Sequence, residues 1–286
     1  MISKTQKIIS LLLKAVTVFS AAVGTFLSVY AGRNYFMGGM NAFMFFTIQS
    51  NIAIAIICVI GAVLLLMGKN GGKVWHVVKF VGTVSITLTC LVFAFALAPT
   101  MGRAAWNFQN TLTHLVGPVA AILDFFVVLA RFEIKKRNVI FGIIPPVLYA
   151  IYAGIGYVQN WQFGKDINYP YFFLDWGSPA GAFGFSKSLP YMGCAWWILL
   201  LLLFLIFNGF IYLLILDGIR KKLEKKKKLN PGYDRHKFLY MLLRPVVTLF
   251  LRLKFNFRRG EMHKDKGPFV LVCNHVTNFD MLFTSC

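Results

Sequence analysis

The residues best suited to chemistry are a threonine and a histidine near the start of two long apolar segments. Thr47 lies in the sequence Phe-Phe-Thr-Ile-Gln-Ser-Asn, and His114 lies in Asn-Thr-Leu-Thr-His. A threonine hydroxyl becomes a nucleophile only when a base removes its proton, and a neutral imidazole is a suitable base. We therefore treat Thr47 and His114 as a candidate nucleophile and base.

The two residues are expected at the same depth of a helix bundle. Thr47 follows the start of its segment by five residues and His114 by six, which places both roughly 7–9 Å from the same end at about 1.5 Å rise per residue. Asp124 comes ten residues after His114, about 15 Å along the helix, and is too distant to orient the imidazole without a relay.

Structural roles are the alternative for the same residues. A threonine in a membrane helix commonly bonds to the carbonyl four residues earlier, and a histidine near an interface is often a polar anchor. Gln49 and Asn51 would then serve as hydrogen-bond partners between helices. Both explanations remain open at the level of sequence.

The composition indicates what kind of fold must position these residues. Of 286 residues, 58% are hydrophobic and 14% are charged, whereas soluble domains have about 45–50% and about 25%. This excludes an ordinary soluble domain and a disordered chain. Five cysteines are too few for a disulfide scaffold, and their spacing fits no zinc site. We expect no metal and no bound cofactor, since no nucleotide-binding pattern is present.

Six segments are long enough to cross a bilayer, which takes roughly 20 apolar residues. The sequence therefore predicts an all-α membrane protein with a six-transmembrane-helix bundle. Pro145 and Pro146 should bend the fifth span or delay its start. The aromatic loop 159–194 should lie at the interface, over the mouth of the bundle. The spans are expected at 8–31, 42–67, 74–97, 108–130, 138–158 and 195–217.

The basic residues predict the orientation. With the N-terminus inside, the inner loops hold eight Lys and Arg and the outer loops four, which agrees with the positive-inside rule. We expect both termini to be cytoplasmic and the membrane to be a bacterial plasma membrane. The net charge of +20 indicates no nucleic-acid partner, because the basic residues flank the spans. The run from Arg220 to Lys228 should attract anionic lipids of the cytoplasmic leaflet. The oligomeric state is left open.

Further motifs accompany the two candidate residues. Phe46 precedes Thr47 in the second span, an Asn comes before His114 with Pro118 and an acidic residue after it, and Tyr169-Pro170, Gly177 and Pro179 precede the last span. With these motifs the membrane segment, residues 1–217, resembles the androgen-induced and androgen-dependent family of six-span membrane hydrolases. The resemblance implies hydrolysis of fatty-acid esters of hydroxy fatty acids, with Thr47 as nucleophile and His114 as its partner.

Beyond the spans, residues 218–234 read as a basic linker. Residues 236–257 alternate apolar and basic positions, as in an amphipathic helix that lies in the interface or packs on a soluble domain. The apolar run 269–273 reads as a buried strand. It leads directly into Asn-His, four further residues and then Asp, which places His275 and Asp280 after the strand.

Residues 235–286 resemble the start of the PlsC-type glycerolipid acyltransferases, which include the lysophosphatidic acid acyltransferases. The resemblance implies that His275 is the general base for the acceptor hydroxyl and that Asp280 orients it, with acyl-CoA or acyl-carrier protein as co-substrate. The alternative is a surface histidine after an edge strand. The family's phosphate-binding and glycine-rich blocks do not follow, so we expect a truncated domain without acyltransferase activity.

The sequence thus favours an integral membrane protein of lipid metabolism, which joins a Thr/His lipid-ester hydrolase to the start of an acyltransferase of phospholipid biosynthesis. One alternative is a non-catalytic anchor or lipid-binding module for an acyltransferase. Another is a small-molecule permease whose path would include Lys14, Gln49 and Asp124.

Overall fold

The computed structural model describes residues 3–31, 39–129 and 134–229. Six of its helices are long and apolar enough to cross a membrane, which confirms the six expected spans. The predicted amphipathic helix and strand, and with them His275 and Asp280, lie outside the described residues. The spans run over Lys4–Tyr30, Phe46–Leu66, Gly72–Met101, Phe108–Val128, Lys136–Val158 and Cys194–Glu224.

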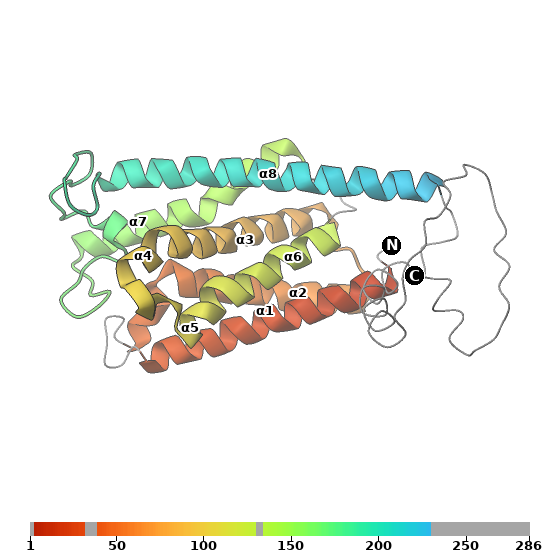
Figure 1. Ribbon diagram of the computed structural model, residues 1–286, viewed down its shortest axis with the longest axis horizontal. Helices are drawn as coiled ribbons and strands as arrows, with labels where there is room; N and C mark the ends of the chain where they lie inside the picture. Colours follow the sequence, from red (N-terminus) through yellow and green to blue (C-terminus); the bar gives the residue numbers. More distant parts are fainter. Residues whose placement is uncertain (1–2, 32–38, 130–133, 230–286) are drawn as a thin grey trace, which may run out of the picture. The chain divides into compact units, whose positions relative to one another are not determined.

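Four helices form the centre of the membrane unit, in which α1 (Lys4–Ala31) packs on α2 (Phe46–Leu66) and on α6 (Gly117–Leu129). The third span, α3 (Gly72–Val92), closes the group by packing on α2 and α6 (Figure 1). The last span is α8 (Cys194–Leu229). It joins the group through Tyr212, whose hydroxyl lies 2.6 Å from Thr87 Oγ1 on α3 and whose ring packs on Phe125.

The basic segment after the last span is partly helical. We expected a linker from residue 218, but α8 continues to Leu229. Lysine and glutamate are good helix formers, and the side chain of Arg220 pairs with Asp217 one turn earlier, at 2.5 Å. The first twelve residues of the basic segment, 218–229, are therefore helical.

Burial is arranged as expected for helices surrounded by lipid. Large apolar side chains cover the outside of the bundle, with Leu12 62% and Phe207 63% exposed. Polar side chains that a soluble protein would expose are instead buried between the helices, because only there can they find partners inside a bilayer. The buried polar group includes Ser10, Lys14, Thr17, Asn51, Lys79, Thr83 and Asp124.

Prolines shape three of the spans. The fifth begins as a 3-10 helix, Lys136–Ile143, and becomes the α-helix α7 at Ile144–Val158. Pro145 lies in the first turn of α7, where its missing N–H costs no hydrogen bond, so the expected late start is confirmed.

Two other spans contain a π-helical turn shortly before a proline. Phe93–Leu97 is π-helical and is followed by Pro99 in α4 (Ala98–Met101). Leu112–Val116 is π-helical and lies between α5 (Phe108–Thr111) and α6, which carries Pro118 in its first turn. A proline cannot donate to the carbonyl four residues earlier, and a wider turn accommodates the lost bond. Single π turns occur frequently at functional sites.

Candidate functional site

Thr47 lies in the first turn of α2, where backbone N–H groups have no partner within the helix. The N-cap residue Phe45 offers no side-chain cap. Instead, the N–H of Thr47 donates to the hydroxyl of Tyr171, at 3.2 Å, and the Thr47 hydroxyl lies 3.3 Å from the same oxygen. The side chain therefore makes its hydrogen bond to the loop and not to the carbonyl four residues earlier.

Tyr171 belongs to the long loop before the last span. Its ring stacks on Phe173 with centroids 5.1 Å apart and meets Phe45 edge-on at 5.7 Å. Burial raises the pKa of Tyr171 above that of a free phenol. The phenol is therefore neutral at physiological pH, so it can donate a hydrogen bond but cannot act as a base.

A mainly apolar cavity lies beside the Thr47 hydroxyl and has a volume of about 60 Å³. The loop lies over this end of the bundle, as expected, because it contributes part of the wall. The hydroxyl of Thr89, which also lines the cavity, is bound to Ser50 Oγ at 2.7 Å. The wall consists of Phe46, Thr47, Leu88, Thr89, Val92, Phe93, Leu97, Pro146, Tyr149, Ala150, Tyr171, Phe173, Leu174, Ile198, Leu201 and Leu202.

His114 is buried in the π turn between α5 and α6. Its Nδ1 lies 3.0 Å from the carbonyl oxygen of Asn110 and 3.0 Å from Thr113 Oγ1. A carbonyl can only accept a hydrogen bond, so Nδ1 carries the proton of the neutral ring and Nε2 has the free lone pair. No hydrogen bond from Nε2 reaches any residue that the structure describes. The tautomer is therefore the one that a general base needs.

The structure places Thr47 and His114 on neighbouring turns but does not join their side chains. The side-chain amide of Asn51 donates to the carbonyl oxygens of Thr47, at 2.8 Å, and of Thr113, at 2.9 Å. Phe93 stacks on the His114 imidazole at 3.7 Å and also lines the cavity. Within the described ranges, no hydrogen bond connects the threonine hydroxyl to the imidazole.

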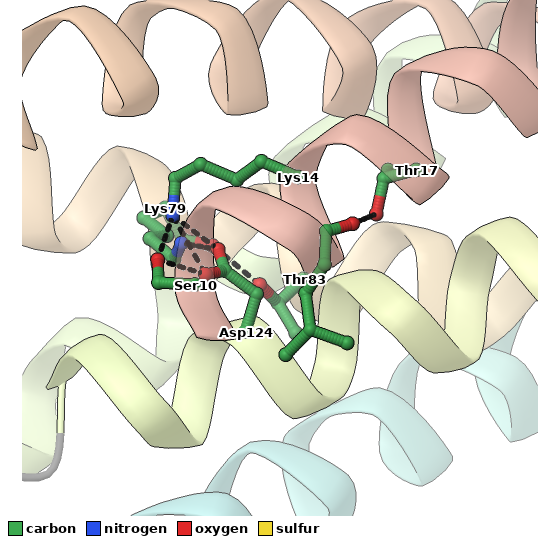
Figure 2. A network of polar contacts seen from close by, with 7 residues as sticks. Ser10, Lys14, Thr17, Lys79, Thr83 and Asp124 are labelled. Atoms are coloured by element: carbon green, nitrogen blue, oxygen red, sulfur yellow. Dashed lines mark hydrogen bonds and ion pairs between the residues drawn. The ribbon is translucent and has the colours of Figure 1, made fainter. Parts of the chain in front are cut away.

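Asp124 has no contact with His114, as its spacing indicated, and forms a separate cluster (Figure 2). Its carboxylate oxygens lie 2.6 and 2.7 Å from Lys14 Nζ, and Ser10 Oγ donates to Oδ1 at 2.5 Å. Lys79 on α3 forms a further ion pair with Oδ2. Lys79 was not among the residues expected from the sequence, although a lysine inside an apolar span was a sufficient signal.

Gln49 does not belong to that cluster. Its side chain is exposed and donates to the carbonyl of Phe43 at 3.0 Å. Gln49 therefore does not join Lys14 and Asp124, the other two residues of the permease path considered above.

Scans against family models, curated proteins and solved structures found no match for the chain. Among the described residues, no three His, Cys, Asp or Glu side chains lie close enough together to hold a metal ion. The geometry of the Thr47 site is therefore the basis for a functional proposal.

Proposed function

We propose that the membrane domain is a lipid-ester hydrolase with Thr47 as its nucleophile. One observation carries the proposal: the Thr47 hydroxyl faces a mainly apolar cavity and is paired with the neutral phenol of Tyr171. A hydroxyl in such a place can attack an ester whose acyl chain is dissolved in the membrane. His275 and Asp280 have no part in this proposal.

The proposed reaction uses three side chains. Thr47 Oγ1 attacks the ester carbonyl carbon, and its proton passes through one bridging water to Nε2 of His114. The carbonyl oxygen becomes an oxyanion that accepts a hydrogen bond from the Tyr171 hydroxyl. Collapse of this intermediate breaks the ester C–O bond, and His114 returns the proton to the leaving alcohol. Water then hydrolyses the acyl-threonine to a free acid and restores Thr47.

The neighbouring residues support these roles. Asn51 holds the turn of Thr47 next to the turn of His114 through the two backbone carbonyls. The bond from Nδ1 to the Asn110 carbonyl fixes the imidazole tautomer. The cavity accepts the carbons next to the ester carbonyl, and the rest of the acyl chain lies in the surrounding lipid.

The test is turnover of a panel of lipid esters by the purified full chain in detergent, including fatty-acid esters of hydroxy fatty acids. We expect Thr47→Ala and His114→Ala each to lower kcat at least 100-fold, since each removes a reacting group. Incubation of the wild type with a fluorophosphonate should label a peptide that contains Thr47.

Thr100→Val is the matched control. Thr100 is exposed at the end of α4, and its hydroxyl donates to the carbonyl of Leu97, so its loss should leave turnover within twofold of the wild type. Unchanged turnover in folded Thr47→Ala protein would refute the proposal, as would a wild type that hydrolyses no ester of the panel.

A further inference from the structure

The cluster around Asp124 is not balanced in charge. It contains two ammonium groups, from Lys14 and Lys79, and a single carboxylate. The three side chains are at most 4% exposed. In the described part of the chain, no other carboxylate lies within ion-pair distance of either lysine. One unit of positive charge therefore remains uncompensated inside the bundle, where burial of a net charge is costly.

The unused hydrogen-bond donors belong to Lys79. The ammonium of Lys14 has three acceptors: the two oxygens of Asp124, at 2.6 and 2.7 Å, and Ser10 Oγ, at 2.6 Å. Lys79 Nζ bonds only to Asp124 Oδ2. An ammonium has three N–H groups, so two of those on Lys79 have no acceptor among the described residues.

A cavity of about 30 Å³ lies against both lysines, at the end of the bundle near the turn between α2 and α3. Its wall contains no carboxylate; its remaining charged or titratable residues are Lys69 and His76, and His76 bonds to the carbonyl of Asn70. The apolar part of the wall consists of Gly61, Leu64, Leu65, Trp75 and Val128.

We propose that this cavity binds a single carboxylate group, held by the free N–H donors of Lys79. A monoanion balances the one excess charge, whereas a phosphate with two charges would reverse it. Since a water molecule needs roughly 10–15 Å³ of cavity volume, the cavity has room for the two oxygens of a carboxylate.

The carboxylate can come from water or from the membrane, and the experiment separates the two sources. The melting temperature of the purified full chain in detergent is measured against sodium acetate, with sodium chloride at equal ionic strength. The melting temperature of the same protein in nanodiscs is measured with increasing palmitic acid, and hexadecan-1-ol serves as the uncharged comparison. We expect a saturable rise of the melting temperature with at least one carboxylate, and none with chloride or the alcohol.

Lys79→Met is the decisive variant. It leaves Lys14 and Asp124 as a neutral pair, so we expect it to fold and to need at least tenfold more carboxylate for half-maximal stabilisation. Lys14→Met is the second variant. It also leaves a neutral pair, in which Lys79 no longer shares Asp124 with a second lysine. Lys73→Met, an exposed residue in the first turn of α3, removes the same charge outside the cavity and should bind as the wild type does.

Three results would overturn the proposal. These are a wild type that no carboxylate stabilises, a chloride effect equal to that of acetate, and a response equal to that of the wild type in Lys79→Met or, if that variant does not fold, in Lys14→Met. None of them depends on ester hydrolysis, so the two proposals can fail separately.

Discussion

The hydroxyl of Tyr171 lies 3.3 Å from the hydroxyl of Thr47, although 124 residues separate the two in the sequence. The same phenol accepts the N–H of Thr47, so a loop residue takes the place of a helix cap. The nucleophile of the proposed reaction is thus positioned by a segment that does not itself cross the membrane.

Tyr171→Phe should therefore lower the kcat of ester hydrolysis about 10- to 100-fold, with little change in KM, because it removes the donor to the oxyanion and retains the ring. The stability cost should be about 1 kcal/mol, the typical value for one hydrogen bond. The check is steady-state kinetics on the best ester of the panel. Tyr191→Phe, at a 55% exposed position of the same loop, is the control; an equal loss there would mean that the loop as a whole was disturbed.

Asp124→Asn should destabilise the protein by about 3–5 kcal/mol, the usual result of removing one partner of a buried ion pair. The reason is that two buried ammonium groups would lose the one carboxylate that pairs with them among the described residues. Thermal or denaturant unfolding in detergent measures the effect. Asp217→Asn breaks the partly exposed pair with Arg220 and should cost no more than about 1 kcal/mol. Equal effects of the two changes would contradict this account of the cluster.

Gly24→Ala should destabilise the protein by about 1–3 kcal/mol, the range for an overpacked core. A Cβ at Gly24 would lie 2.5 Å from the methyl carbon of Thr113, next to His114. Gly154→Ala in α7 meets nothing within 4 Å and should stabilise the protein by up to about 1 kcal/mol through helix propensity. Opposite shifts of the melting temperature would confirm both expectations, whereas a stable Gly24→Ala variant would show that α1 can move away.

The orientation expected from the positive-inside rule is tested by labelling single cysteines in intact cells. In a background where the five cysteines are replaced by serine or alanine, Ser186→Cys in the long loop should react with an impermeant maleimide added outside. Asn70→Cys, in the turn between α2 and α3, should react only after permeabilisation. The reverse pattern would place both termini outside.

The spans could be predicted from the sequence because their length and apolar composition follow from the thickness of the bilayer. The depth of Thr47 could be estimated for the same reason. Its partner could not, because the direction in which a helical side chain points depends on packing and not on span length. Only the folded loop shows that Tyr171 reaches Thr47.

The hydrophobic periodicity of the sequence could not predict the π turn around His114 either, although Pro118 indicated a local break in the helix. Lys79 is the residue of the Asp124 cluster that was not expected from the sequence. Each charged residue in a span was visible by itself, but the pairing of Lys14, Lys79 and Asp124 requires knowledge of which helices are neighbours.

The cavity beside Thr47 has a consequence for the biosynthesis of the protein. Its wall combines Thr47 from the second span with Ile198, Leu201 and Leu202 from the last. Spans enter the membrane in the order of synthesis, so the cavity is completed only after the ribosome has passed the last span. Nascent chains stopped before that point would carry Thr47 beside a cavity that lacks the wall formed by the last span.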